Sequence, residues 1–77
     1  MEITRLTAEQ KVAYWVRRYR KEHNITQADL SDRISITRCS VNNWEKSRAP
    51  ISIEYLDAIS KVLGVHITLF FQDIPID

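Results

Sequence analysis

The sequence predicts an all-α domain of five helices. The chain of 77 residues contains one Gly and two Pro, so few residues favour long turns. Apolar residues recur every three or four positions, which is the spacing of one helix face. Four residues that commonly cap helices precede these apolar stretches. Together these observations favour helices joined by short connections.

The first helix is predicted to begin at Thr7. In "TAEQ" the Thr7 side chain can cap the helix while Gln10 reaches back, which is a capping box. Apolar side chains then recur at helical spacing and form an inward stripe of Val12, Trp15, Val16 and Tyr19. Asn24 follows, where a residue in the left-handed conformation commonly ends a helix.

The second and third helices are predicted to begin at the caps Thr26 and Thr37. Only Ser35 and Ile36 join them, so the two helices must cross steeply. The crossing is held by a shared inner face of Leu30, Ile34, Ile36, Val41 and Trp44. The outer face of the third helix is therefore expected to stand out as a ridge.

The fourth helix is predicted from Ser52 to Leu63, with Gly64 directly after its end. Residues 65–71 allow two interpretations. Apolar and polar residues alternate from 65 to 69, as in a strand, whereas "TLFF" favours a short fifth helix. We favour the helix, and Pro75 ends any regular structure.

The charge of the chain is unevenly distributed. Residues 1–50 contain ten Lys or Arg and six Asp or Glu, a balance of +4, whereas residues 51–77 contain one and four, a balance of −3. A polyanionic partner would therefore meet the first part of the chain. We expect a single domain over residues 1–77 with its core in residues 7–71, and no room for a sensor domain.

Several classes of function are not expected. No apolar run approaches the roughly 20 residues of a membrane span, and the N-terminus lacks an apolar signal core. The lone Cys39 fits a reducing, cytoplasmic setting. One Cys and two scattered His predict no metal site. Without a paired acid and base or a phosphate-binding Gly loop, neither an enzyme nor a cofactor is expected.

The ridge on the third helix carries the candidate functional residues. An α-helix fits the major groove of DNA, where Arg pairs well with guanine and Asn with adenine. The predicted base contacts are Thr37, Arg38, Cys39, Asn42 and Asn43.

At this point the chain resembles a known family. The stretch "NITQADLSDRISITRCSVNNWEKSRAPISIEYLDAISKVLGV" is similar to the lambda-repressor-like helix-turn-helix domain of the Cro/XRE family. The resemblance covers about residues 12–71, with the helix-turn-helix motif at 26–46. The matching positions are Thr26, Gln27, Leu30, Thr37, Val41, Glu45, Pro50, Ser52, Leu63, Gly64 and Val65.

The resemblance implies roles for further residues. It implies DNA phosphate contacts from Gln27, Lys46 and Arg48, to which we add Arg17 or Arg18. It also implies an ion pair between Arg20 and Glu45 that ties the first helix to the end of the third.

Three positions depart from the family pattern. Ser35 and Ser47 stand where the family usually has Gly, and Ser31 stands where it usually has Ala. Because Ser tolerates a left-handed backbone less well than Gly, these departures concern the geometry of the turns and not the fold.

The predicted function is a sequence-specific regulator of transcription, of bacterial or phage type and most consistent with a repressor. Its partner would be double-stranded operator DNA. The operator is expected to be an inverted repeat bound by a homodimer. The apolar tail residues Leu69, Phe70 and Phe71 are the predicted dimer interface, with one of the two Phe expected to cap the core against the first helix and the other to be exposed. Three alternatives remain open: a restriction–modification controller, an antitoxin that represses its own operon, and a protein-interaction module that does not bind DNA.

Overall fold

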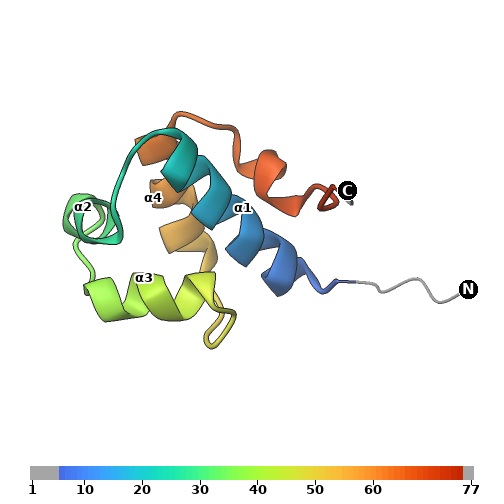
Figure 1. The fold of residues 1–77 in the computed structure, drawn as a ribbon, viewed down its shortest axis with the longest axis horizontal. Helices are drawn as coiled ribbons and strands as arrows, with labels where there is room; N and C mark the ends of the chain where they lie inside the picture. The colour runs from blue at the N-terminus through green and yellow to red at the C-terminus, as the bar shows by residue number, and fades with distance from the viewer. Residues whose placement is uncertain (1–5, 76–77) are drawn as a thin grey trace, which may run out of the picture.

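The computed structural model describes residues 6–75, so the ends of the predicted domain, residues 1–5 and 76–77, lie outside the described residues. The elements in chain order are α1 (Ala8–Glu22), α2 (Gln27–Arg33), α3 (Arg38–Glu45), α4 (Ile53–Leu63) and the 3₁₀-helix η1 (Ile67–Phe71) (Figure 1). The all-α prediction is confirmed, with one difference. The fifth helix is a short 3₁₀-helix rather than an α-helix, and the strand alternative for residues 65–69 is wrong.

The predicted N-caps are all present. Thr7 Oγ1 accepts a hydrogen bond from the backbone N–H of Gln10 at 3.1 Å, and Gln10 Oε1 accepts one from the N–H of Thr7 at 2.9 Å. The side chains of the other three predicted caps each accept a bond from the N–H three residues later: Thr26, Thr37 and Ser52. Interactions within four residues along the chain therefore set where each α-helix begins.

All four α-helices end in the same way. The residue after each C-cap, or the C-cap itself in α4, has a left-handed backbone, with φ values of 56° to 66° at Asn24, Ser35, Ser47 and Gly64. At each end one backbone N–H bonds a carbonyl three residues back, and the next N–H bonds a carbonyl five residues back. This pair of bonds is the Schellman arrangement, which satisfies carbonyl groups that the helix leaves open.

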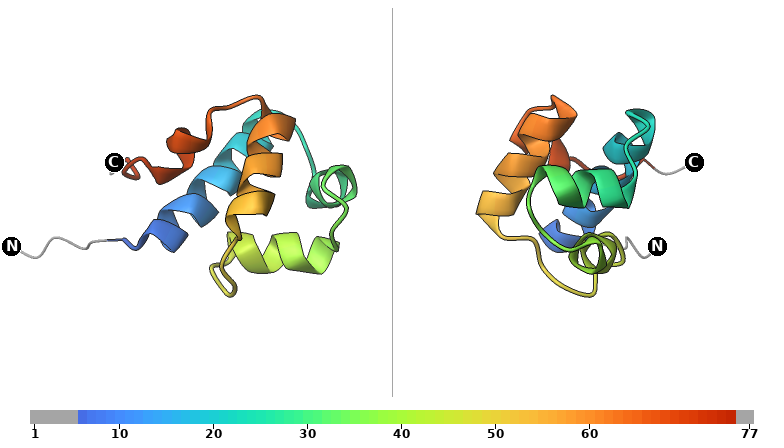
Figure 2. Two further views of the ribbon diagram at one scale, coloured as in Figure 1. Left: turned by 180° about the vertical axis from the view of Figure 1, so that it is seen from behind. Right: turned by 90° about the vertical axis from the view of Figure 1, so that its left-hand side faces the viewer.

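The core lies between α1 and the other elements. Figures 1 and 2 show α3 and η1 on opposite sides of α1, with α4 packed behind it. The most deeply buried side chains come from all five elements: Val16, Leu30, Val41, Ile59, Leu63 and Phe70. Both Trp15 and Trp44 are also buried, so the predicted inward faces of α1 and α3 are correct.

Aromatic side chains join the C-terminal segment to α1. Phe70 is completely buried, and its ring meets the ring of Tyr19 edge-on with centroids 6.0 Å apart. Tyr19 in turn stacks on Trp15 at 5.4 Å. Trp15 Nε1 donates a hydrogen bond to the carbonyl of Gln72 at 2.9 Å, which fixes the chain just after η1.

Within residues 6–75 the longest helices are too short and too polar to cross a membrane.

Candidate nucleic-acid interface

The joint between α2 and α3 is a tight turn with Ser35 in the left-handed conformation. Its backbone N–H bonds the carbonyl of Asp32 at 3.3 Å, and the N–H of Ile36 bonds the carbonyl of Ser31 at 2.9 Å. Ser35 therefore adopts the geometry for which Gly is usual. Ser31 is buried between the two helices, and its hydroxyl donates to the carbonyl of Ala28 at 2.7 Å. The Ser31 hydroxyl, which the Ala usual at this position would lack, thus has its hydrogen-bond partner within α2.

Helix α3 presents the predicted ridge to solvent. Thr37, Arg38 and Cys39 at its beginning are exposed, whereas Asn42 and Asn43 in its second turn are half-buried. The opposite face of α3 is anchored in the core by Val41 and Trp44. Four of the five predicted base-contact residues therefore lie on one short helix whose position is fixed by its apolar face, and the fifth, Thr37, is its N-cap.

A buried ion pair joins α1 to the end of α3. Arg20 Nε and Nη2 lie 2.6 and 2.8 Å from the two carboxylate oxygens of Glu45. The two side chains are 9% and 2% exposed. Arg20 Nη1 also donates to the carbonyl of Ile25 at 2.8 Å. The predicted pair is present, and its two parallel bonds fix the direction as well as the distance of the contact.

Gln27 does not point freely toward solvent. Its Nε2 lies 3.1 Å from Glu45 Oε1 and 3.3 Å from Asn42 Oδ1, so it links the beginning of α2 to the middle of α3. A side-chain contact from Gln27 to a phosphate would require its amide to leave one of these partners. No sequence pattern predicts the link to Asn42, because the two residues are 15 positions apart and neither is apolar.

Comparison with known families identifies the architecture. A sequence model described as helix-turn-helix matches residues 16–70. The chain belongs to the Cro/C1-type helix-turn-helix family. The match includes α2, the turn at Ser35 and α3, and it ends within η1.

This helix-turn-helix chain is similar to an uncharacterised HTH-type transcriptional regulator, y4aM of Sinorhizobium fredii. The two are 36% identical over 62 residues, which cover 80% of this chain but 43% of that relative.

Solved structures share the fold. The restriction–modification controller protein C.Esp1396I aligns with a TM-score of 0.75 and 27% identity over 87% of both chains. The clp gene regulator ClgR of Corynebacterium glutamicum aligns with a TM-score of 0.82 and 16% identity, over 87% of this chain and 71% of that one. The biofilm regulator SinR, solved with DNA, aligns with a TM-score of 0.74 and 21% identity, over 79% of this chain and 98% of that one.

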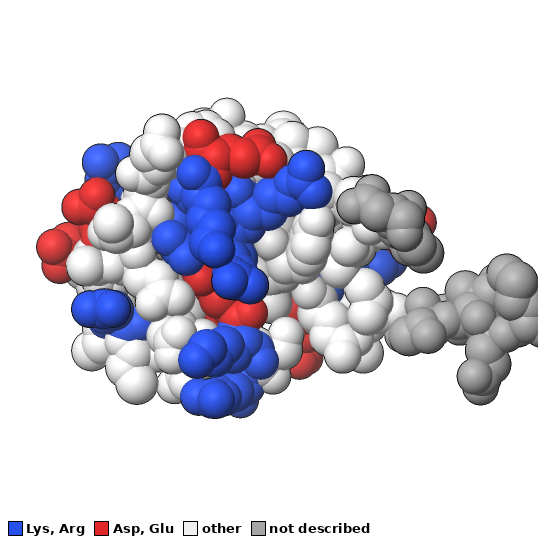
Figure 3. Space-filling model, in the orientation of Figure 1, with Lys and Arg blue, Asp and Glu red and all other residues white. Residues whose placement is uncertain are grey.

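Basic side chains gather on one face of the helix-turn-helix protein. Figure 3 shows Lys and Arg over α1 and around the turn that follows α3, with a few acidic groups between them. Lys46 and Arg48 lie in that turn and are exposed, as is Arg17 on α1. The candidate phosphate-binding residues of this family member thus come from both ends of the motif and from α1.

Arg18 differs from the other basic residues because it is engaged on the surface of α1. Its Nη1 donates to the Tyr14 hydroxyl at 2.8 Å, its Nε donates to Glu22 Oε2 at 3.0 Å, and its guanidinium lies 5.8 Å from the centre of the Trp15 ring. The bonds to Tyr14 and Glu22 raise the pKa of Arg18 above its ordinary value. Among the candidate phosphate contacts, Arg17 is therefore the better placed of the two.

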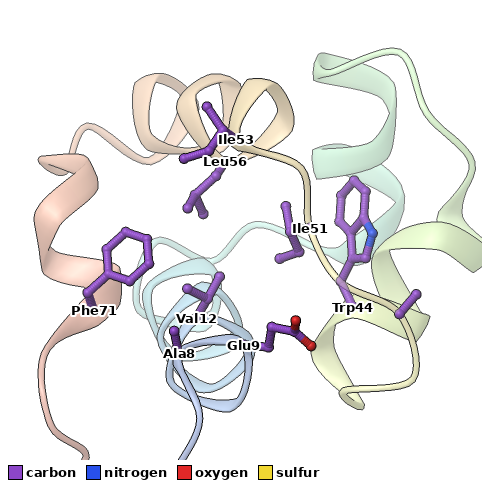
Figure 4. Close-up of a pocket in the computed structure, with 9 residues that line it drawn as sticks. Ala8, Glu9, Val12, Trp44, Ile51, Ile53, Leu56 and Phe71 are labelled. Carbon is purple, nitrogen blue, oxygen red and sulfur yellow. The ribbon is translucent and has the colours of Figure 1, made fainter.

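An apolar groove of about 170 Å³ lies away from α3's exposed ridge (Figure 4). It is lined by the beginnings of α1 and α4, the segment after α3 and the end of η1: Ala8, Glu9, Val12, Trp44, Ala49, Ile51, Ile53, Leu56 and Phe71. Ile53 is 68% exposed and Phe71 is 43% exposed. Ile53 was not among the residues predicted for an interface, although it lies at the beginning of α4 beside the groove.

The predicted dimer residues are not equivalent. Leu69 and Phe71 are partly exposed, whereas Phe70 is completely buried. Phe70 is thus a core residue that supports η1, and the prediction that it contributes to an interface surface is wrong for this residue.

No cluster of three or more His, Cys, Asp or Glu that could bind a metal ion occurs in the part of the chain that the structure describes.

Proposed function

We propose that this protein is a sequence-specific regulator of transcription that binds double-stranded DNA and reads the major groove with α3. The observation that carries the proposal is the ridge of α3. There the exposed Arg38 and Cys39 and the half-buried Asn42 and Asn43 lie on the side of the helix away from its buried anchors, Val41 and Trp44. A rigid helix with polar groups on its free face suits base reading. We favour a repressor that acts in the cytoplasm.

In the proposed complex, exposed basic groups set the register on the DNA backbone. Lys46, Arg48 and Arg17 would contact phosphates, with Arg18 as a further candidate. Each phosphate that is neutralised releases counterions, so the affinity would fall steeply with salt. Base preference, in contrast, would depend on α3.

We further propose a symmetric homodimer. Its support is the exposure of the apolar side chains of Leu69, Phe71 and Ile53, of which Phe71 and Ile53 line the groove. A two-fold contact of this kind is self-complementary, because each copy offers both the groove and the side chains that fill it. The dimer would place two α3 ridges roughly 34 Å apart, one turn of DNA.

The decisive experiment is selection of bound duplexes from a random DNA pool at two salt concentrations. An enriched inverted repeat with half-sites about ten base pairs apart is the expected result. A lack of any enriched sequence would contradict base reading by α3 and would favour a protein-interaction module. Sedimentation at micromolar protein, with and without the enriched duplex, tests the dimer, and a monomer in both conditions would disprove it.

One narrower candidate has a specific observation in its favour. The likeness to C.Esp1396I, at 27% identity over 87% of both chains, favours a restriction–modification controller over the antitoxin alternative. Repression of a promoter that carries the enriched repeat, measured with a reporter, would test the sign of regulation.

A further inference from the structure

The amide of Gln27 has one orientation that satisfies its surroundings. Gln27 begins α2 and is half-buried, and its Nε2 lies between Glu45 Oε1 at 3.1 Å and Asn42 Oδ1 at 3.3 Å. An ionised carboxylate can only accept hydrogen bonds. The NH₂ end of the Gln27 amide must therefore face Glu45, since the opposite orientation would place an oxygen against the carboxylate.

The Glu45 carboxylate cannot easily turn to change this requirement. Both of its oxygens accept bonds from Arg20, at 2.6 and 2.8 Å, and its side chain is 2% exposed. Arg20 is held in turn by the carbonyl of Ile25. Glu45 Oε1 is thus an acceptor at a fixed position, to which one N–H of Gln27 donates.

The second N–H of Gln27 then determines which way Asn42 faces. Only the oxygen of the Asn42 amide can accept this bond, so Oδ1 turns toward Gln27. The NH₂ group of Asn42 is at the other end of the same amide and is not engaged by Gln27. The buried pair of Arg20 and Glu45 thus sets the orientation of the Gln27 amide, and this amide sets the orientation of the Asn42 amide on the ridge.

We propose that Gln27 is a positioning residue that fixes Asn42 as a hydrogen-bond donor toward the DNA bases. This inference rests on the proposed function and specifies how one position of the site works. The base edges that such a donor recognises in the major groove are the acceptors N7 and O6 of guanine, N7 of adenine and O4 of thymine. Both N–H groups of Gln27 are used within the protein, so its side chain does not serve as a phosphate donor, in contrast to the role implied by the family resemblance.

The test is a double-mutant cycle with a matched control. Gln27→Leu removes the amide and leaves both bonds between Arg20 and Glu45 in place. It is combined with Asn42→Ala and, as the control, with Asn43→Ala. Asn43 lies in the same turn of α3, and its Nδ2 lies 3.7 Å from Cys39 Sγ. Binding of each variant is measured against the enriched duplex and against all of its single base-pair changes.

Gln27→Leu is expected to relax preference at the base pair affected by Asn42→Ala, and at no other. The effects of Gln27→Leu and Asn42→Ala on Kd should be non-multiplicative by about threefold or more, whereas those of Gln27→Leu and Asn43→Ala should multiply. A loss of affinity that is equal for all duplexes and independent of Asn42 would indicate a phosphate contact and overturn the proposal.

A measurement on the free protein separates this proposal from the proposed function. In ¹H–¹⁵N spectra, Gln27→Leu should shift the side-chain amide signals of Asn42 and leave those of Asn43 in place. Unchanged Asn42 signals would overturn the proposal even if the protein reads DNA. If the wild type enriches no duplex, the proposed function fails and base recognition by Asn42 fails with it.

Discussion

Helix α1 is joined to two of its neighbours, η1 and α3, by different chemistry. Toward η1 it uses aromatic surface, with Trp15 and Tyr19 packed near the buried Phe70. Toward α3 it uses the buried pair of Arg20 and Glu45. Aromatic burial stabilises strongly but accepts several arrangements of similar shape, whereas a bidentate ion pair accepts few. The α3 side, which carries the candidate base contacts, is thus the side whose geometry is the more narrowly defined.

The largest expected effect is on the polar side of α1, where Arg20 pairs with Glu45 of α3. Arg20→Met leaves the Glu45 carboxylate buried without its partner and should lower the free energy of unfolding by about 3–5 kcal/mol. Urea unfolding followed by circular dichroism measures the loss. The double variant Arg20→Met, Glu45→Met serves as the control, because removing both charges should recover most of the stability. A single variant as stable as the double would show that the pair is not effectively buried.

The next effect concerns DNA binding by α3, the helix that the pair of Arg20 and Glu45 holds in place. Arg38→Ala should weaken binding to the enriched duplex by about 1–3 kcal/mol and relax preference at one base pair. Lys46→Ala is the matched control, because loss of a phosphate contact should weaken all duplexes alike and reduce the salt dependence. Identical specificity profiles for wild type and Arg38→Ala would exclude Arg38 as a base-reading residue.

The aromatic side of α1, where Phe70 of η1 packs, should tolerate a change in side-chain shape better. Phe70→Leu retains a buried apolar side chain and should cost about 1 kcal/mol or slightly more, measured by the same unfolding experiment. Base preference should stay unchanged, because η1 lies across α1 from α3 (Figure 2). A changed preference would show that the two sides are coupled through α1.

The helix ends on the polar side offer a smaller effect. Ser35 and Ser47 have φ values of 56° and 57°, so Ser35→Gly and Ser47→Gly relieve left-handed strain. Each should raise the free energy of unfolding by up to about 1 kcal/mol. The larger conformational entropy of Gly in the unfolded chain offsets part of this gain. Gly64→Ala is the reverse control: an added Cβ would meet no atom within 4 Å, so its expected loss of about 1 kcal/mol is purely conformational. Destabilisation by both Gly variants would contradict the strain argument.

The smallest effect concerns the ion pair of Lys11 with Asp73, which follows η1 along the chain. Lys11 Nζ lies 2.8 Å from Asp73 Oδ1, and its hydrogen bond and charge lower the pKa of Asp73. A lowered carboxyl pKa stabilises the fold above the unfolded pKa, and this contribution is lost as pH falls through the folded value. Because Asp73 is highly exposed, the effect on stability should be small and sensitive to salt. NMR titration of Asp73 should show a pKa that rises in Lys11→Met, and an unchanged value would disprove the pairing in solution.

Local sequence signals predicted most of the fold. The N-caps at Thr7, Thr26, Thr37 and Ser52 were identified correctly, as was the end of α4 at Gly64. The exposed ridge of α3 also followed from the spacing of Val41 and Trp44. Residues 65–71 were ambiguous, because a 3₁₀-helix has a period between those of a strand and an α-helix. The ion pair of Arg20 with Glu45 came from family resemblance and not from spacing, since 25 positions separate the two residues.

The sequence by itself determined where the helices begin and end and which residues face outward on α3, because caps and helical periodicity depend on neighbours within about four residues. Tertiary structure alone decided two other matters. It buried Phe70 and exposed Phe71, and it turned the amide of Gln27 toward Glu45 and Asn42. Each of these depends on groups brought together from distant parts of the chain, whose burial and hydrogen bonding exist only after the helices have packed.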